Sequence, residues 1–384
     1  MEKKKIIRIT TIPGSMLTLL KGQLKYMSEF YEIIGVSSQD PYLSKLEDQE
    51  NIRTHAINMT RNISPLKDLK SAYQLYKYLK REKPFLVHTH TPKAGTLGML
   101  AARLAGVPNR LHTVAGLPLL EATGRKRNLL NVVEKITYAN ATLIIPNSTG
   151  LQEIIKKNKF ASDNKLKIIG NGSSNGIDTE YFNKANIDIN QQENLKTQLN
   201  ISNDEFVFIY VGRLVADKGI NELVHAFNSV SNANKKTKLL LVGIFESNLD
   251  PLNTETLKEI EQNNNIIYVE WQSDVRPYFA ISNALVFPSY REGFPNVVMQ
   301  AGAMELACIV TDINGCNEII SHKNNGLIIA PKSKKELQNA MQYLIDNPAD
   351  LAVFSSNARD NIIAKYKKEI IWDSLLNLYR SLEF

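Results

Sequence analysis

The sequence predicts an α/β protein made of two doubly wound parallel-sheet domains that face a cleft. The chain has 384 residues, which is too long for one core of ordinary size and suits two domains of roughly 180 residues each. With 43% hydrophobic residues, it can bury two cores of that size. Short β-rich runs alternate with helical patterns, stop at a polar segment and then begin again, as two successive parallel sheets covered by helices require.

The first series of β-rich runs predicts the sheet of an N-terminal domain, which we assign to residues 1–182. Each run is short and bounded by turn residues or by a helical pattern, as expected for a parallel strand with crossover helices. The runs are residues 5–10, 32–38, 52–57, 85–89, 110–114, 142–146 and 167–169.

The second series of runs follows residues 183–199, a strand-poor segment rich in Asn and Gln that we predict to be a linker. It assigns a C-terminal domain to residues 200–367. Its predicted strands are residues 206–211, 238–242, 266–270, 284–287, 308–311 and 326–329. The last helical pattern, residues 368–382, is strongly apolar on one side and needs a partner surface. We therefore expect residues 368–384 to pack back on the first domain, and we expect the active site in the cleft.

Several classes of protein are disfavoured by absent motifs. Cys308 and Cys316 are the only cysteines and lack metal-ligand spacing, so neither a disulfide framework nor a metal site is expected. Neither half contains a Gly-x-Gly-x-x-Gly turn or a Walker lysine loop, which argues against a nicotinamide enzyme or a P-loop nucleotidase. No run approaches the roughly 20 apolar residues of a membrane span, and no signal peptide precedes the first strand. These features predict a cytoplasmic protein.

The charge of the chain is unevenly distributed. Residues 1–182 hold 27 Lys and Arg against 15 Asp and Glu, a net charge of +12, so the total of +7 leaves −5 for the rest. Basic residues cluster at positions 3–5, 67–83, 125–127 and 156–159. Two interpretations remain open: solvated helix faces, or attraction to an anionic membrane surface or a diphosphate lipid. Nucleic acid is not an expected partner, because the clusters are not interleaved with aromatics.

The segment of residues 288–302 is the most informative part of the chain. The run before it predicts a buried parallel strand, and the apolar pattern of residues 297–306 predicts a helix after it. Glu292 therefore lies at the carboxyl end of a strand, where ligands bind in open α/β sheets. The alternative, a carboxylate that only caps the helix, is less favoured because a Gly-Phe-Pro insertion separates it from the first turn.

The start of the same helix predicts an anion site. The N–H groups of Asn296, Val297 and Val298 lie at the positive end of the helix and would receive a diphosphate, while Glu292 would reach sugar hydroxyls. The predicted donor-binding residues of this segment are Glu292, Gly293, Phe294, Asn296, Val297 and Gln300.

A second motif, residues 211–219, combines a strand ending in Gly212-Arg213 with Lys218-Gly before a helix. With the Glu292 segment, it resembles the retaining glycosyltransferases of the GT-B fold, the Glu-x7-Glu family also known as glycosyl transferases group 1 or family 4. The resemblance covers nearly the whole chain and implies two Rossmann-like domains. Its further motifs are residues 13–15, 88–90 and 172–178.

Within that family, the chain is most similar to enzymes that act on undecaprenyl-diphosphate-linked glycans, through residues 59–68 and 311–320. The resemblance implies transfer of a hexose or N-acetylhexosamine from a UDP-sugar to such a saccharide during capsule or O-antigen synthesis. It also implies a peripheral protein at the inner face of the plasma membrane.

The resemblance gives roles to the charged residues, and physical chemistry supports them. Arg213 would grip diphosphate oxygens with its planar fork and Lys218 would add a point charge, which neutralises the leaving nucleotide without a metal. Gly212 would shape the turn, and Gly14 would let its loop approach the phosphate closely. The simpler interpretations are a surface ion pair for Arg213 and an ordinary turn for Gly14.

Two positions depart from the family pattern. The usual second glutamate is Gln300, which would hydrogen-bond a ribose hydroxyl without charge assistance or serve only as a partly buried amide. Ala115 replaces a histidine that many members carry, and His112 lies nearby on a strand with period two. The family is thought to use front-face substitution, in which the leaving phosphate takes the acceptor's proton. Catalysis would then rest on positioning and charge stabilisation, with Glu292, Arg213 and Lys218 as the catalytic residues.

Acceptor binding is assigned to the first domain. Arg61, His90 and Lys93 are the main candidates, because these cations could hold a lipid diphosphate; His112 is a weaker one. His88 is expected to be a satisfied buried histidine. In the second domain, Trp271 borders the nucleobase or belongs to the core.

Two other functions stay open at this point. A sugar-nucleotide epimerase or a phosphorylase of the same fold would need no lipid acceptor. A catalytically weakened sugar-nucleotide-binding partner would bind nucleotide without transfer, which the changes at Gln300 and Ala115 permit.

Overall fold

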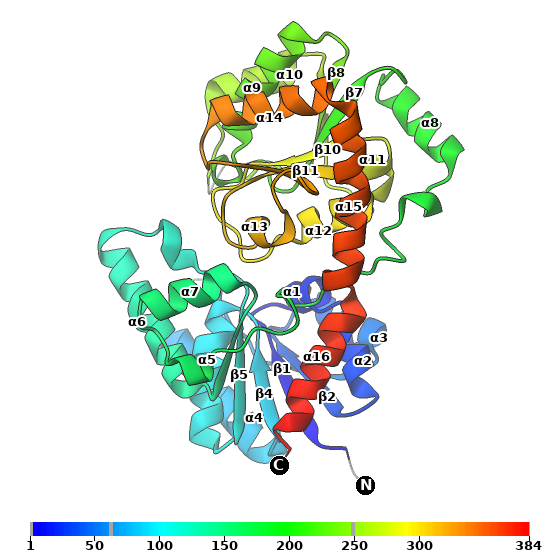
Figure 1. Cartoon of the computed structure of the whole chain (residues 1–384). Helices are drawn as coiled ribbons and strands as arrows, with labels where there is room; N and C mark the ends of the chain where they lie inside the picture. The colour runs from blue at the N-terminus through cyan, green and yellow to red at the C-terminus, as the bar shows by residue number, and fades with distance from the viewer. Residues whose placement is uncertain (1–2, 61–63, 247–249, 384) are drawn as a thin grey trace. The chain divides into compact units, whose positions relative to one another are not determined.

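The computed structural model describes residues 3–60, 64–246 and 250–383, and its chain divides into two compact units (Figure 1). Unit 1 comprises residues 1–176 and 369–384, and unit 2 comprises residues 177–368. Each unit contains one six-stranded, all-parallel sheet. The predicted fold class, two doubly wound α/β domains, is confirmed.

The sheet of unit 1 has the strand order β3-β2-β1-β4-β5-β6. Its strands are β1 (Lys5–Ile9), β2 (Glu32–Ser37), β3 (Arg53–Ala56), β4 (Leu86–Thr89), β5 (Asn109–Val114) and β6 (Leu143–Pro146). The seventh predicted strand, residues 167–169, is wrong: only an isolated bridge between Ile144 and Leu166 forms there. This run follows the edge strand β6 and continues into the turn at Gly170, so it does not extend the ladder.

Helices cover both faces of this sheet because the crossovers change direction at β1 and β4. One face packs against α4 to α7 and the other against α1 to α3 together with α16, as the two separate apolar clusters show. The helices are α1 (Pro13–Leu19), α2 (Gln23–Ser28), α3 (Tyr42–Glu50), α4 (Pro65–Glu82), α5 (Pro92–Ala105), α6 (Gly124–Asn140), α7 (Thr149–Lys157) and α16 (Lys368–Ser381).

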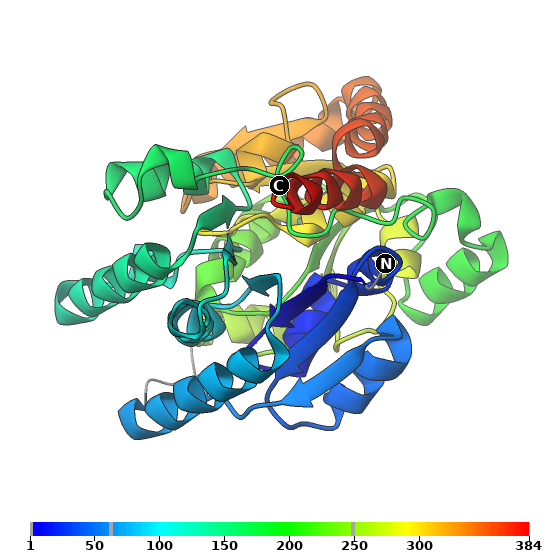
Figure 2. The same ribbon diagram turned by 90° about the horizontal axis from the view of Figure 1, so that it is seen from below.

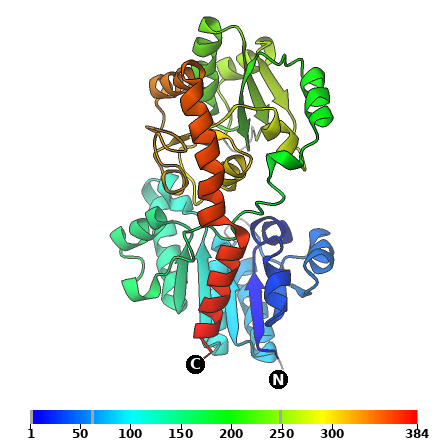
Figure 3. The ribbon, with the colours of Figure 1, turned by 45° about the vertical axis from the view of Figure 1, so that its right-hand side comes forward.

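The C-terminal helix α16 belongs to unit 1, as its apolar stripe predicted. Ile371, Trp372, Leu375 and Tyr379 are buried in one cluster with residues of β1 and α2. Figure 3 shows the helix lying along this layer of the unit. Trp372 also donates its indole N–H to Asn175 Oδ1 at 2.7 Å.

The sheet of unit 2 has the order β12-β11-β10-β7-β8-β9, which repeats the topology of unit 1. All six predicted strands form: β7 (Phe206–Val211), β8 (Thr237–Val242), β9 (Ile266–Val269), β10 (Ala284–Phe287), β11 (Ala307–Thr311) and β12 (Gly326–Ile329). Apart from the edge strand β9, the strands are mostly buried, so they read as nearly continuous apolar runs.

The helices of unit 2 close a single apolar core around this sheet. They are α8 (Ile189–Gln198), α9 (Ile220–Ala233), α10 (Thr254–Gln262), α11 (Arg276–Ala280), α12 (Asn296–Ala303), α13 (Cys316–Ile319), α14 (Lys334–Asp346) and α15 (Pro348–Tyr366). Residues 183–199, predicted as a linker, lie in unit 2 and include α8. Ile187, Leu195 and Leu199 attach this segment to the core, and the boundary between the units falls earlier, after Gly176.

Candidate functional site

The candidate donor site lies at the switch point of the unit 2 sheet. β7 and β10 are neighbours, but the chain leaves β7 toward β8 and leaves β10 toward β11. The loops after these two strands therefore separate at the carboxyl ends and leave the crevice where doubly wound sheets bind ligands. Arg213 and Lys218 follow β7, and Glu292 follows β10. The fold thus brings the two predicted motifs to one place.

Glu292 and Lys218 form an ion pair at the centre of this site, and both side chains are largely buried. Ser289 donates its hydroxyl to the same carboxylate oxygen, Glu292 Oε1, at 2.9 Å. Ser289 is itself fully buried, and its carbonyl accepts a hydrogen bond from Thr311 on β11. Glu292 is therefore held from two sides, by Lys218 of the loop after β7 and by Ser289 of its own loop, as a positioned carboxylate needs to be.

The loops after β7 and β10 are locked together by contacts that the sequence interpretation missed. Tyr290 donates its backbone N–H to Asp217 O at 2.9 Å, and Arg291 pairs with the Asp217 carboxylate at 2.9 Å. A Cβ added to Gly219, whose φ is +73°, would lie 2.2 Å from Pro288 O. Only glycine allows this approach, which sets Lys218 opposite Glu292. Asp217 and Arg291 are charged residues of opposite sign, one in each motif. They were the signal in the sequence from which this contact could have been predicted.

The loop after β11 supports the Glu292 turn from the other side. The Asn314 side-chain amide donates to Glu292 O, and a Cβ on Gly315 would lie 2.6 Å from Gly293 O. Cys316 is buried beside this turn; burial and the nearby Glu292 raise the pKa of its thiol. Asn314 belongs to residues 311–320, a segment whose sequence had indicated only a subgroup resemblance.

Arg213 points to a different partner. Its Nη1 atom lies 2.6 Å from Glu246 Oε2, in an ion pair that is partly open to solvent. Gly212 before it has φ +151°, and the Tyr210 hydroxyl donates to Arg213 O at 2.9 Å, which fixes the turn. Glu246 follows β8 and was not singled out from the sequence. It pairs with the guanidinium group that we predict to bind phosphate.

Helix α12 begins one residue earlier and ends three residues earlier than predicted, at Asn296 and Ala303. Asn296 and Val297 are its first two residues, but Val298 donates its N–H to Pro295 O at 3.2 Å, so the prediction of three free N–H groups is wrong. The Val298 N–H is not free because Pro295 caps the helix and its carbonyl accepts this bond in a tight first turn. Gln300 is half-buried one turn further along.

Two predicted donor residues differ in their surroundings. Phe294 is buried in the core, with its ring centroid 5.3 Å from that of Tyr366, so only its backbone faces the Gly293 turn. Trp271 follows β9 and is 67% exposed, which excludes the interpretation as a core residue.

The switch point of unit 1, between β1 and β4, holds two of the four predicted acceptor residues, His90 and Lys93. Thr11 and Thr91 join the two loops there through a hydroxyl–hydroxyl contact of 2.7 Å. Gly14 was expected in a loop but is the second residue of α1, because Pro13 begins a helix readily. A Cβ added to Gly14 would meet no described atom within 4 Å, so the protein's own packing leaves that space open.

His90 is buried and accepts a hydrogen bond from Arg8 Nε at 3.0 Å. Arg8 is also fully buried, and its Nη2 donates to Gln23 Oε1 at 2.6 Å. Among the described residues, neither Arg8 Nη1 nor His90 Nδ1 has a hydrogen-bond partner. Burial, with His88 and Arg8 nearby, lowers the pKa of His90 well below its usual value. His90 therefore lies among buried polar groups.

Lys93 pairs with Asp68 Oδ2 at 2.5 Å, and both side chains are largely buried between α4 and α5. A lipid diphosphate would have to compete with this carboxylate. Arg61, the third cationic candidate, lies outside the described residues.

His88 and His112 are buried in the sheet of unit 1. His88 contacts Tyr379 OH and Thr113 Oγ1, each at 2.7 Å, which is the satisfied buried histidine that was expected. His112 Nδ1 lies 2.8 Å from Thr89 Oγ1, and burial lowers the pKa of His112 to about 4. A Cβ on Gly95 would lie 2.4 Å from the His112 ring, so α5 covers this side chain closely.

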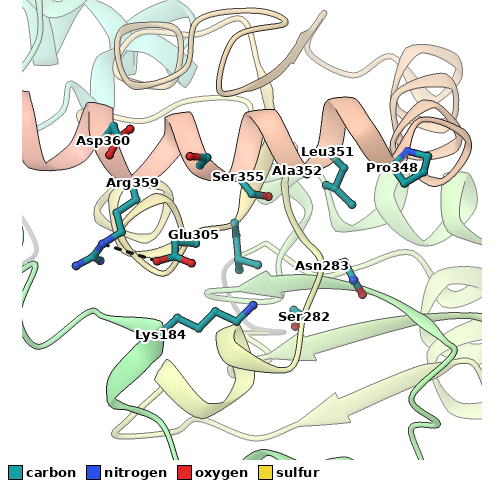
Figure 4. Close-up of a pocket in the computed structure, with 12 residues that line it drawn as sticks. Lys184, Ser282, Asn283, Glu305, Pro348, Leu351, Ala352, Ser355, Arg359 and Asp360 are labelled. Carbon is teal, nitrogen blue, oxygen red and sulfur yellow. Dashed lines mark ion pairs between the residues drawn. The ribbon is translucent and has the colours of Figure 1, made fainter. Parts of the chain in front are cut away.

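Unit 2 contains a cavity of about 510 Å³ at the opposite end of its sheet (Figure 4). Lys184, Ser282, Glu305 and Arg359 are among the residues that line it. Ser282 immediately precedes the turn into β10, so the cavity lies at the amino ends of the strands, away from Glu292. It is not part of the candidate donor site.

The described part of the chain contains neither a metal-binding cluster nor a membrane-spanning helix. No group of three or more His, Cys, Asp and Glu side chains is placed to hold a metal ion. Among the described residues, none of the helices combines the length and apolar character needed to cross a bilayer.

Comparison with known proteins identifies the family. The model of "Glycosyl transferases group 1" matches residues 191–361, and that of "Glycosyl transferase 4-like" matches residues 14–148. The capsular polysaccharide biosynthesis glycosyltransferase CapM of Staphylococcus aureus is 33% identical over 99% of this chain and 98% of its own. The chain belongs to the group 1 glycosyl transferases.

Other members of this glycosyltransferase family extend the comparison. An Escherichia coli relative, UDP-Gal:alpha-D-GlcNAc-diphosphoundecaprenol alpha-1,3-galactosyltransferase, is 31% identical over 98% of this chain and 97% of its own. Among solved structures, HepE from Anabaena in complex with UDP has a TM-score of 0.81 at 18% identity, covering 98% of this chain and 100% of that one. The structural similarity to HepE shows the fold of this chain, which is GT-B.

Proposed function

We propose that this glycosyltransferase moves a hexose or N-acetylhexosamine from a UDP-sugar to an undecaprenyl-diphosphate-linked saccharide in surface polysaccharide synthesis. The observation that carries the proposal is the Lys218–Glu292 pair at the switch point of unit 2, with Arg213 on the neighbouring loop. The name of the Escherichia coli relative, which specifies a UDP-sugar and a diphosphoundecaprenol acceptor, supports both substrate classes.

The donor would lie across the carboxyl ends of β7 and β10. The diphosphate carries negative charge that Lys218 and Arg213 can neutralise, so we propose that no metal ion is needed. Binding would draw Lys218 toward the phosphates and leave the Glu292 carboxylate, still held by Ser289, free to accept hydrogen bonds from sugar hydroxyls. Arg213 would exchange Glu246 for phosphate oxygens. HepE, which shares this fold, was solved with UDP.

Transfer would proceed with retention of the anomeric configuration. The bond from the anomeric carbon to the diphosphate oxygen breaks, and the acceptor oxygen bonds to the same face of the sugar. The acceptor's proton passes to the leaving phosphate oxygen, so no side-chain base is required at Ala115. The residues then act by positioning the substrates and by stabilising charge on the leaving group.

The acceptor would bind to unit 1, with Lys93 near its diphosphate and the protein resting peripherally on the inner face of the plasma membrane. Lys93 is the described candidate with a cationic head at the switch point of this unit, although Asp68 holds it in the absence of acceptor. The high positive charge of residues 1–182 favours an anionic surface and an anionic lipid.

The test is a calorimetric titration of metal-free protein with UDP, with GDP and NAD as controls. We expect a heat of binding with UDP but not with GDP or NAD. The Arg213→Ala variant should lose the heat of UDP binding. Lys238→Ala is the matched control, since Lys238 also forms an ion pair in unit 2 but lies at the amino end of the sheet. Heat with GDP alone would change the donor class, and silence with all three would overturn the proposal.

A transfer assay then separates the remaining functions. Purified protein, UDP-sugars and a membrane extract containing lipid-linked saccharides should give a labelled lipid product. Turnover of the nucleotide sugar alone, or only with phosphate, would indicate an epimerase or a phosphorylase. UDP binding without any product would indicate a nucleotide-binding partner of another transferase.

A further inference from the structure

Helices α4 and α6 of unit 1 expose six large apolar side chains to solvent. This is unusual because such side chains normally pack in a core or scatter singly over a surface. On α4 they are Leu66, Leu69 and Tyr73, at 85%, 71% and 60% exposure, and on α6 they are Leu129, Val132 and Ile136, at 49%, 52% and 43%.

The spacing on the two helices is the same. In each helix the exposed apolar residues stand at positions i, i+3 and i+7, so they share one face. Both helices contact α5 and cover the same face of the sheet, on either side of it. Figure 2 shows α4 and α6 flanking α5 in this layer. We call the exposed faces of these two helices the α4–α6 surface.

The charges around this surface are cationic. Exposed lysines and arginines on the two helices include Lys67, Lys70, Lys77 and Lys80 on α4 and Arg125, Lys126 and Lys135 on α6. The acidic residues of both helices are occupied elsewhere. Asp68 pairs with Lys93, Glu82 pairs with Lys5 at 2.8 Å, and Glu134 is buried. The solvent side therefore combines apolar and positively charged groups.

We propose that the α4–α6 surface docks on an anionic lipid bilayer, with its leucine, valine, isoleucine and tyrosine side chains inserted at the headgroup boundary. An interfacial helix needs an apolar stripe bordered by cations, and both helices have one. The cations would meet anionic headgroups at the same depth. A second copy of the chain is a poorer occupant, because two surfaces of the same positive charge repel each other.

This inference deepens the proposed function by naming the surface that meets the membrane. Its test uses neither a sugar nucleotide nor an acceptor. Failure of UDP binding and failure of membrane docking would therefore be seen in different experiments.

The experiment is sedimentation of the full chain with vesicles of phosphatidylglycerol and phosphatidylcholine, compared with vesicles of phosphatidylcholine alone. We expect binding to the anionic vesicles. The variant Leu66→Gln/Leu69→Gln/Leu129→Gln should lower the partition coefficient about a hundredfold or more, since each inserted leucine is worth at least about fivefold. Lys67→Gln/Lys70→Gln/Lys126→Gln should lower it about a hundredfold, at about fivefold per cation.

The matched control is Ile189→Gln/Val353→Gln, which removes two exposed apolar side chains from α8 and α15 of unit 2. It should bind vesicles like the unchanged protein. Thermal unfolding and UDP titration of every variant exclude misfolding as the cause of lost binding.

Insertion has a direct readout in Leu129→Trp. Its fluorescence should shift to the blue with anionic vesicles, beyond any change from Trp271 and Trp372 in the unchanged protein. Absence of vesicle binding would overturn the proposal. Binding that survives the leucine substitutions without a blue shift would show electrostatic contact only and would also overturn it. A concentration-dependent dimer abolished by the same substitutions would assign the surface to a second copy instead.

Discussion

The two units share one strand order, but the carboxyl ends of their sheets differ in construction. In unit 2 the loops hold two ion pairs, the largely buried Lys218–Glu292 pair and the partly exposed Arg213–Glu246 pair. In unit 1 the corresponding position is filled by a buried polar network around Arg8, His88 and His90, and the remaining cavity of about 10 Å³ is no larger than a water site.

The difference shows that topology gives the place for a site and the loops give its chemistry. Arg213 and Glu246 remain near solvent, so Arg213 can exchange its partner for a ligand at little cost in desolvation. Arg8 and His90 are hydrogen-bonded to each other inside unit 1, and separating them would leave further buried polar atoms without partners, so we expect them to contribute mainly to the stability of the unit. Changes in the unit 2 network should alter catalysis, and changes in the unit 1 network should alter stability.

The largest expected effect is on catalysis in Glu292→Gln. The amide keeps the shape but loses the charge that pairs with Lys218 and positions sugar hydroxyls, so transfer should fall about a hundredfold or more. UDP affinity should change less than about fivefold. The measurement is kcat/KM for lipid-linked product together with a UDP titration.

Glu205→Gln is the matched control, because the Glu205–Lys238 pair is equally buried at the amino end of the same sheet. The transfer activity of Glu205→Gln should stay within about twofold of that of the unchanged enzyme. If Glu292→Gln kept full transfer activity, this carboxylate would not be part of the active site. The contrast between the two units would then fail.

The next effect is on stability in Gly219→Ala, which tests how the loops of unit 2 are fixed. The added Cβ would strike Pro288 O, so we expect a loss of about 3 kcal/mol in the free energy of unfolding. Gly106→Ala is the control: its φ of +78° matches, but open space surrounds it, so only the backbone strain of about 1 kcal/mol should appear. Equal losses in denaturant unfolding would show that the close approach is unimportant.

The sequence predicted the strands of unit 2 completely because buried parallel strands such as β7 and β10 are continuous apolar runs. It also predicted that Glu292 and Arg213 lie at strand ends, since both follow such runs directly. It did not predict Asn314 or Glu246, because their contacts join loops that are far apart in the chain. Ser289 lies only three residues before Glu292, but the direction of its hydroxyl depends on the folded loop. The helical position of Gly14 was missed because Pro-Gly is equally typical of a turn.

A smaller effect is expected for Asn314→Ala. Loss of its hydrogen bond to Glu292 O should loosen the Glu292 turn and lower kcat about tenfold while KM for the donor changes little. Asn317→Ala is the control, because Asn317 lies three residues further on, in α13, but bonds the exposed Asp312 at 2.8 Å. If both variants keep full kcat, the loop after β11 does not position the carboxylate.

The smallest effect is that of His112→Gln on the pH dependence of the stability of unit 1. Burial lowers the pKa of His88, His90 and His112, the last to about 4, so the folded state holds these rings neutral while the unfolded chain protonates them. The stability they contribute is complete above the unfolded pKa of about 6.5 and is lost as the pH falls toward the folded values, by about 1 kcal/mol per histidine between about pH 7.5 and pH 5.5. Urea unfolding at the two pH values measures this loss, and His112→Gln should reduce it by about 1 kcal/mol. His225→Gln, a change at an exposed position on α9, should leave the loss unchanged. If His225→Gln reduced the loss as much as His112→Gln, the buried network would not be what distinguishes unit 1 from unit 2.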